Sequence, residues 1–296
     1  MPCLHKGYFN LMRWCMVKSR GFLFLCLLFL FSCTASDNGE SGYRYSKYED
    51  TSLAKVIVKG NLVVGIMDYA PPCAFLDNTG QVVGFDVDIF KEVAARLEVD
   101  VEFKTINNWF LKDEMLQTGE IDCIASNFTF SKDRELSYAL TMPTLYNAQI
   151  IVVRKTSDIM QLKDLEQKKV SYLHSSSVEK MFESGGELDK MFEDIKFKEV
   201  QEYKSFLTAL DDLKLHVVDA VIMDILIMNY IMKKSPNDYR ILDDALTSER
   251  YVYAFRRGDR LLRDAIEKIM LELEYEGKVL ELSKKWFGSD VYLFGR

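Results

Sequence analysis

The amino-acid sequence predicts an α/β protein with two lobes. Apolar segments of strand length alternate with amphipathic segments of helix length, which is the pattern of a largely parallel sheet covered on both faces. The alternation runs over about a hundred residues, is interrupted and starts again, so two lobes are expected rather than one large sheet. The chain has 296 residues, of which 48% are hydrophobic, enough to fill two packed cores.

The first unit contains three predicted strands and two predicted helices. Strands are expected at 61–67 (NLVVGIM), 99–106 (VDVEFKTI) and 121–126 (IDCIAS), because each run is apolar and short. Helices are expected at 86–98 and at 110–120, where apolar residues recur at helical spacing. This order of elements is typical of parallel strands joined by crossover helices.

The second unit repeats this order of elements. Its predicted strands are 168–173, 195–200 and 217–224, and its predicted helices are 175–186, 203–216 and 225–234. After a further strand-like run at 251–258, the sequence is helical from 260 to 288. No strand follows this last helical region, so it is expected to pack on a lobe that is already built.

Residues 1–33 have the features of a secretory signal. Four bases and no acid come first, and the apolar run 21–33 that follows is short for a membrane span. The run ends in LFSC, which resembles the lipobox of bacterial lipoproteins and implies cleavage before a lipidated Cys33. An ordinary signal peptide and an uncleaved anchor are the alternatives. The polar, aperiodic segment 34–52 is expected to be a flexible tether.

Charge and cysteine usage exclude two classes of partner. Removal of the signal changes the formal net charge from −7 to −11, and an acidic surface argues against nucleic acid. Outside residues 1–33 only two cysteines, Cys73 and Cys123, and two histidines, His174 and His216, remain, so no metal site or cofactor is expected. The two cysteines are expected to be buried free thiols, although the sequence also permits a disulfide.

Polar residues gather where the predicted strands end. In open parallel sheets, ligands bind beyond the carboxyl ends of the strands, which here are Asp68–Phe75, Ser126–Arg134, His174–Ser177 and Asp224. An arginine suits a carboxylate, a helix that opens with serines favours an anion, and an acid at a strand end suits an ammonium group. An α-amino acid carries both groups and fits this combination.

Four stretches in order carry a resemblance to a known family. They are GQVVGFDVDIFKEVAARL, LQTGEIDCIASNFTFSKDRELSYALTMP, VDAVIMD and YEGKVLELSKKWFG, between Leu62 and Gly288. With this spacing the chain resembles the family 3 periplasmic solute-binding proteins, the amino-acid receptors of ABC importers. The resemblance implies a type II periplasmic-binding-protein fold with a ligand cleft between the lobes. It also implies capture without catalysis, a membrane permease as partner, and an extracytoplasmic monomer, here anchored through Cys33.

The resemblance also implies a role for individual residues. The family's carboxylate clamp falls on Asn127, Thr129 and Arg134, and its second-lobe donors fall on Ser175–Ser177, of which Ser176 and Ser177 are the predicted contacts. The ammonium acceptor falls on Asp224. The aromatic residue that stacks on the ligand side chain falls on Trp109.

The first loop departs from the family pattern. When the sequences are aligned on Pro72, Asp68 and Tyr69 are each one residue out of register with the family's acidic and aromatic residues, and Cys73 replaces a phenylalanine. Both Asp68 and Tyr69 are kept as candidate ligand contacts. The preference for a ligand side chain is expected to depend on this loop.

The predicted lobes are interleaved along the chain. Lobe 1 is expected to comprise 53–153 plus 253–296 and lobe 2 to comprise 155–246, with crossings near 153–156 and 250–257. Ligand would bind lobe 1 first, and closure would add the contacts of lobe 2.

Several alternatives remain at this stage. Arg134 could pair with neighbouring acids on the surface, and Asp224 and the serines could cap their own helices. The chain could be a periplasmic enzyme of the dehydratase type on the same fold, with Asp68, His174 and Glu179 as candidate acids or bases, or a tethered sensor without a transport role. The sequence assigns neither the amino acid, nor the permease, nor the membrane that holds the lipid.

Overall fold

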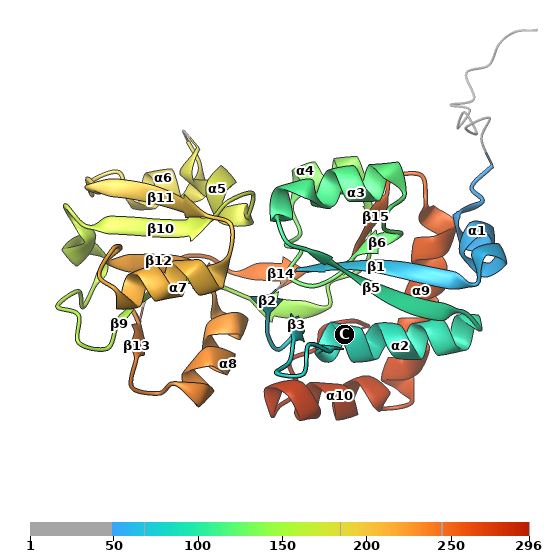
Figure 1. Cartoon of the computed structure of the whole chain (residues 1–296). Helices are drawn as coiled ribbons and strands as arrows, with labels where there is room; N and C mark the ends of the chain where they lie inside the picture. Colours follow the sequence, from blue (N-terminus) through green and yellow to red (C-terminus); the bar gives the residue numbers. More distant parts are fainter. Residues whose placement is uncertain (1–48, 68, 184, 244, 296) are drawn as a thin grey trace, which may run out of the picture. The chain divides into compact units, whose positions relative to one another are not determined.

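The computed structural model describes residues 49–67, 69–183, 185–243 and 245–295. Residues 49–296 form one compact unit, and within it two separate five-stranded sheets are each flanked by helices (Figure 1). This arrangement confirms the predicted two-lobed α/β class. The predicted signal segment, Cys33 and most of the predicted tether lie outside the described residues.

The first sheet is mixed, with the strand order β5-β1-β6-β15-β7. Its strands are β1 (Asn61–Met67), β5 (Asp100–Ile106), β6 (Cys123–Ile124), β7 (Tyr138–Leu140) and β15 (Ala254–Arg256). β5 and β6 run parallel to β1, and β15 pairs antiparallel with both β6 and β7. A strand from near the end of the chain therefore completes the sheet that the first strands begin.

Helices cover both faces of the first sheet (Figure 1). They are α1 (Ser52–Lys59), α2 (Phe85–Leu97), the 3-10 turn η1 (Trp109–Leu111), α3 (Lys112–Thr118), α4 (Lys132–Ser137), α9 (Arg260–Tyr275) and α10 (Lys278–Phe287). α9 buries Leu262, Ile266, Ile269, Met270 and Leu273, which share one helical face. These residues belong to the same core as β1 and α2, so the C-terminal helices pack on the first lobe.

Helix α1 begins within the predicted tether. Ser52 is buried and is its first residue, and its hydroxyl accepts a hydrogen bond from Leu262 N–H at 3.1 Å. The carboxylate of Asp50 accepts one from Leu261 N–H at 2.7 Å. The last residues of the segment 34–52 are therefore attached to α9, which a polar composition does not predict.

The second sheet has the order β11-β10-β12-β9-β13. Its strands are β9 (Gln149–Arg154), β10 (Lys169–Leu173), β11 (Glu199–Tyr203), β12 (Ala220–Asp224) and β13 (Tyr239–Ile241). The flanking helices are η2 (Leu162–Leu165), α5 (Ser177–Phe182), α6 (Glu187–Met191), α7 (Phe206–Lys214) and α8 (Ile225–Lys234). Along β12, Ala220 and Ile222 pack in the core beneath α5 and α6, whereas Val221 and Met223 pack with α7.

The first crossing between the lobes comes earlier than predicted. Strand β9 pairs with β12 and β13, so residues 149–153 belong to the second lobe and not to the first. The predicted boundary at 153 is wrong because the apolar run QIIVVR would suit either sheet. Apolar character alone does not say which sheet a strand joins. The crossing itself is β8 (Leu145–Asn147), which pairs antiparallel with the returning strand β14 (Glu249–Tyr251).

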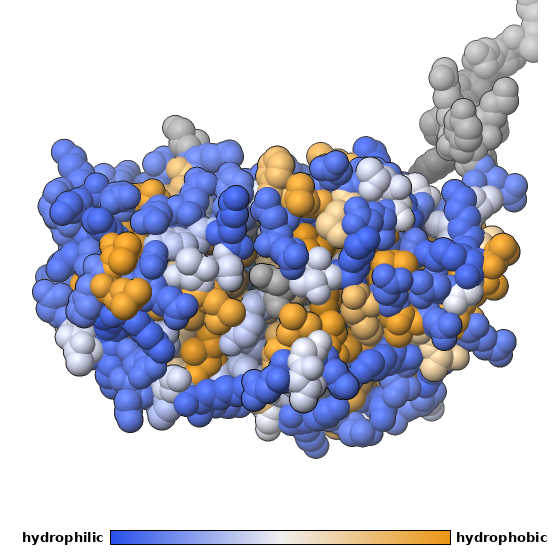
Figure 2. Space-filling view, viewed as in Figure 1, coloured by the Kyte–Doolittle hydropathy of each residue, from blue (hydrophilic) through white to orange (hydrophobic). Residues whose placement is uncertain are grey.

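The lobes also contact each other away from the crossing strands. A short hairpin of β2 (Tyr69–Ala70), β3 (Ala74–Leu76) and β4 (Val82–Val83) extends from the first lobe. Phe75 on β3 contacts Tyr230 on α8, with 5.2 Å between ring centroids. The face shown in Figure 2 is mostly hydrophilic, and hydrophobic side chains gather in its middle, where the lobes meet.

Both cysteines in the described residues are buried free thiols, as predicted. Burial raises the pKa of Cys73 and of Cys123 well above the ordinary thiol value. None of the helices in the described part of the chain is long and apolar enough to cross a membrane.

Gly84 joins the hairpin to α2 at a very close approach. Its φ of 142° lies in a region that suits glycine, and a Cβ there would lie 2.2 Å from the Cys73 carbonyl oxygen. The next two N–H groups, of Phe85 and Asp86, donate to the carbonyls of Pro72 and Cys73, each at 2.9 Å. The start of α2 therefore holds the Pro72–Cys73 turn in place.

Gly84→Ala is expected to lower the melting temperature strongly, because the added Cβ displaces the Pro72–Cys73 turn. We expect a cost of about 3 kcal/mol or more, which for a chain of this size is a shift of several degrees, measured by circular dichroism. Gly80→Ala is the matched control, since Gly80 also has a positive φ but a Cβ there meets nothing within 4 Å. Equal losses in the two variants would contradict the close approach.

Candidate functional site

A small enclosed pocket lies between the two lobes. Its free volume is about 10 Å³, which is room for about one water molecule. Seven of the nine predicted contact residues line it: Trp109, Asn127, Thr129, Arg134, Ser176, Ser177 and Asp224. The other lining residues are Met67, Gln149, Leu173, Val178, Phe206 and Ile222. A wider groove between α8 and α10 is more open, and among the described residues its lining includes Lys233 but no acidic residue.

Arg134 presents a guanidinium that has no acidic partner among the described residues. Its Nη1 donates to the Thr129 carbonyl oxygen at 2.6 Å, and the group lies 4.2 Å from the centre of the Phe128 ring. In the described part of the chain no carboxylate lies within 4.0 Å of it, and Asp133 pairs with Lys180 instead. Burial lowers the pKa of Arg134. The remaining donors of its planar fork are therefore available to an anion in the pocket.

The backbone before Arg134 turns sharply at the end of β6. Ser126 and Asn127 both have positive φ values, 65° and 54°. The Ser126 hydroxyl accepts a hydrogen bond from Met67 N–H at 3.3 Å, which ties this turn to the end of β1. Left-handed backbone at two non-glycine residues is uncommon and concentrates at functional sites. The turn directs Asn127 and Thr129 toward the pocket.

The second lobe contributes the start of α5. The Ser176 hydroxyl is buried and has no hydrogen-bond partner among the described residues. The Ser177 hydroxyl donates to Glu249 Oε1 at 2.7 Å. Neither serine side chain caps α5. Ser176 is therefore a polar group in the pocket wall whose hydrogen bonding is left to a ligand.

Asp224 ends β12 and points toward the crossing strands. It occupies the N-cap position of α8, but its side chain makes no capping hydrogen bond. Oδ1 accepts instead from Tyr251 Oη at 2.7 Å and from Gln149 Nε2 at 2.9 Å, and also from Asn147 Nδ2. Burial raises the pKa of Asp224 to about 7, the neighbouring Glu249 adds to this, and the three hydrogen bonds oppose it.

Glu249 is a buried carboxylate that sequence reasoning missed. It lies on β14, is only 5% exposed, and accepts from the Thr129 hydroxyl at 3.2 Å. The amides of Asn147 and Gln149 each donate to it at 2.9 Å. These neighbours come from two separate parts of the chain, Thr129 from the first lobe and 147–149 from the crossing. An acid two residues before the apolar run YVYAF was the one available signal, and it gains meaning only once that run is known to join the lobes.

Trp109 forms part of the apolar side of the pocket. It is 4% exposed and begins the turn η1, where the Asn108 side chain accepts from Phe110 N–H at 3.4 Å. Leu173 and Phe206 of the second lobe belong to the same apolar cluster. The pocket therefore has one charged side and one apolar side.

The first loop contributes less than predicted. Tyr69 is half-buried in β2 and is not among the pocket-lining residues. Burial raises its pKa, and the neighbours that add to this are Tyr230 and Tyr239 of the second lobe. Asp68 lies outside the described residues. Met67 is the residue of this loop region that lines the pocket.

Comparison with known proteins shows extensive similarity. The family model for bacterial extracellular solute-binding proteins, family 3, matches residues 62–289. The L-cystine-binding protein TcyJ of Escherichia coli K12 is 26% identical over 254 residues, 85% of this chain and 92% of that protein. The structure of Tv2483 bound to L-arginine has a TM-score of 0.77 and 29% identity, covering 84% of this chain and 99% of that one. The structure of a substrate-binding protein of an ABC uptake transporter from Streptococcus pneumoniae, with bound histidine, has a TM-score of 0.77 and 28% identity. The match covers 82% of this chain and 98% of that one.

Glu249→Gln is expected to change how stability depends on pH in the ligand-free protein. The pKa of Asp224 is raised in the folded state, so its protonated form contributes stability that is lost as pH rises from about 4 to about 7. Removing the charge of Glu249 reduces that loss. The melting temperature of the variant minus that of the parent is therefore expected to increase by about 2–4 °C between pH 5 and pH 8.

Glu276→Gln serves as the control, because Glu276 is an exposed partner of Arg96 far along the chain from the pocket residues. A difference between Glu249→Gln and the parent that stays constant from pH 5 to pH 8 would show that the two carboxyl groups do not interact.

Proposed function

This chain belongs to the bacterial extracellular solute-binding proteins of family 3, and on that premise we propose that it captures an α-amino acid between its lobes for import by an ABC transporter. The observation that carries the proposal is the pairing of opposite charges in one small enclosed pocket. The guanidinium of Arg134 faces it from the first lobe, and the carboxyl group of Asp224 faces it from the second. A zwitterionic ligand satisfies both groups.

The α-carboxylate would bind at the Arg134 side. Arg134 has donors to spare, and the Ser176 hydroxyl is buried without a partner among the described residues. The Thr129 hydroxyl, which now donates to Glu249, can turn to a ligand oxygen. Together these groups supply charge-assisted and neutral hydrogen bonds to one carboxylate.

The α-ammonium would bind at Asp224. The Asp224 carboxyl group lines the pocket, and the neighbouring Glu249 increases the negative charge available to a cation. A bound ammonium would favour the ionised form of Asp224 and release the proton that burial holds there. The ligand would thus offset the cost of keeping two carboxyl groups close together.

The ligand's side chain would lie toward Trp109, Met67, Leu173 and Phe206. The relatives are named for cystine or hold arginine or histidine. These ligands share only the α-carboxylate and α-ammonium groups, which are what Arg134 and Asp224 would recognise. The proposal therefore extends to amino acids as a class.

Closure of the lobes would complete the site. Arg134, Thr129 and Trp109 belong to the first lobe, whereas Ser176, Ser177 and Asp224 belong to the second. A ligand favours the closed state only through contacts that form on closing. The second-lobe residues would provide these contacts, and β8 and β14 would act as the hinge.

Capture without catalysis is supported by the positions of His174 and Glu179, the two candidate acids or bases among the described residues. His174 and Glu179 are not pocket-lining residues, and they lie beside Glu202 instead. The charged groups of the described pocket are Arg134 and Asp224, with Glu249 behind them, and each has a binding role in the proposal. A receptor that remains a monomer and docks on a membrane permease fits the family.

The N-terminal segment would hold the receptor outside the cytoplasm. The signal 1–33 would direct secretion, and lipid on Cys33 would anchor the mature protein. The tether would run from 34 to about Glu49, because Asp50 and Ser52 bond to α9.

Thermal unfolding in the presence of each of the twenty amino acids, and of cystine, tests ligand capture. A true ligand at 100 times its dissociation constant is expected to add about 2.7 kcal/mol of stability. Arg134→Ala should abolish the shift, because no other arginine or lysine lines the described pocket. Arg96→Ala, which removes a surface arginine on α2, is the control and should leave the shift unchanged.

Absence of a shift with all twenty amino acids and with cystine would refute this class of ligand and favour dipeptides or other carboxylates. A shift that survives Arg134→Ala within a few-fold in affinity would remove Arg134 from the carboxylate site.

Cys33→Ser is expected to release the mature protein from the membrane fraction, because the lipid would be attached to the Cys33 sulfur. Membrane fractionation and the mass of the N-terminal peptide measure this. Cys26→Ser, within the same apolar run, is the control and should keep the acyl group. A parent protein with no N-terminal acyl group would refute the lipid anchor.

A further inference from the structure

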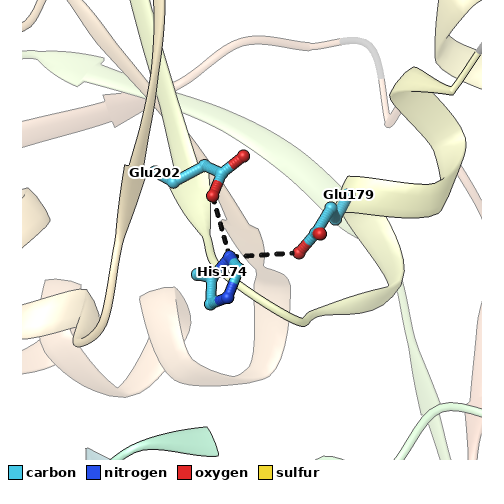
Figure 3. Close-up of side chains that lie close together, drawn as sticks. All are labelled: His174, Glu179 and Glu202. Atoms are coloured by element: carbon cyan, nitrogen blue, oxygen red, sulfur yellow. Dashed lines mark hydrogen bonds and ion pairs between the residues drawn. The ribbon is translucent and has the colours of Figure 1, made fainter. Parts of the chain in front are cut away.

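His174, Glu179 and Glu202 converge at one point on the second lobe, outside the amino-acid pocket (Figure 3). We propose that these three side chains form a binding site for a divalent transition-metal ion, with Zn²⁺ as the probe. The sequence predicts no metal site, because two histidines and two cysteines are too few for a cluster of those residues. The structure supplies carboxylates as the missing ligands.

The three ligand atoms have a spacing that suits a metal ion. His174 Nδ1 lies 2.8 Å from Glu202 Oε2 and 3.4 Å from Glu179 Oε2. One atom from each of the three residues lies within 4.8 Å of the other two. Zinc bonds to nitrogen and to carboxylate oxygen are about 2.0–2.2 Å, so two ligands of a tetrahedral ion are about 3.4 Å apart. Small rotations of the carboxylates are enough to place an ion between the three atoms.

Neighbouring groups hold each carboxylate in position. Glu202 Oε1 accepts from the Tyr172 hydroxyl at 2.8 Å, and the two residues are directly opposite on β10 and β11. Glu179 Oε2 accepts from Ser175 N–H at 2.5 Å. Hydrogen bonds of this kind orient ligands and strengthen metal sites. The three ligands therefore project from a strand end, a strand and a helix start that are already ordered.

The local charge also favours a cation. In the described part of the chain, neither Glu179 nor Glu202 has a lysine or arginine nitrogen within 4.0 Å, and the imidazole of His174 is their shared partner. Their side chains are 35% and 46% exposed, and that of His174 is 33% exposed, so an ion can enter and water can complete its coordination. One imidazole and two carboxylates are a donor set suited to Zn²⁺ and similar ions.

The site lies beside the cleft between the lobes. The His174 ring stacks on Phe110 of the first lobe, with 5.9 Å between centroids and 27° between planes. Ser175, whose N–H holds Glu179, directly precedes the pocket residues Ser176 and Ser177. Metal binding is nevertheless independent of amino-acid binding in this proposal, because the two sites share no side chain.

Isothermal titration of untagged, metal-free mature protein with Zn²⁺ tests the site. We expect one Zn²⁺ per chain, and His174→Ala and Glu202→Gln should each weaken binding about tenfold or more. His216→Ala is the matched control, because it removes the other histidine of the described residues, which lies in the turn after α7. That variant should bind Zn²⁺ as the parent does.

Cobalt substitution provides a second readout. Bound Co²⁺ should give visible d–d bands without thiolate charge-transfer bands, because Cys73 and Cys123 are not ligands. Failure of the parent to bind one Zn²⁺, or parent-like affinity in both His174→Ala and Glu202→Gln, would overturn the proposal and leave an ion pair only. Circular dichroism of each variant establishes that it is folded.

Discussion

Two buried carboxyl groups lie where the chain crosses between the lobes, and the arrangement around them organises the site. Asp224 and Glu249 come from different elements, and burial of two like charges is costly unless hydrogen bonds compensate. The compensating donors come from Asn147, Gln149 and Tyr251 on the two crossing segments. The need to hydrogen-bond these two buried carboxyl groups thus links the crossing strands, the end of β12 and the wall of the pocket.

The cost of burying two carboxyl groups together links the stability of the protein to ligand binding. Burial, with the nearby Glu249 adding to it, raises the pKa of Asp224 to about 7, so the carboxyl pair favours holding a proton when no cation is present. An ammonium group placed beside Asp224 would offset the repulsion between the two carboxyl groups. Arg134, on the opposite side, is buried with one backbone acceptor and no acidic partner among the described residues. Each lobe therefore carries an unmatched charge that a zwitterion between them would neutralise.

The second lobe presents polar groups on two sides of the start of α5. Ser176 and Ser177 face the amino-acid pocket, whereas His174 and Glu179 face Glu202 outside it. The left-handed backbone of Ser175, with φ of 58°, separates the two directions. A short segment of chain thus contributes to the candidate amino-acid pocket and to the proposed metal site, and the two share no side chain.

The sequence by itself determined the alternation of strands and helices and the strand ends where Arg134, Asp224 and Trp109 lie, because periodicity and apolar runs are local properties. It also located the buried thiols. The tertiary structure alone decided that β9 joins the second sheet and that Glu249, Asn147 and Gln149 meet Asp224. These outcomes depend on pairing between residues far apart in the chain, and an apolar run or a single acid carries no information about its distant partner. The sequence does not place Glu202 beside His174 for the same reason, since the two residues meet only through the register of β10 and β11.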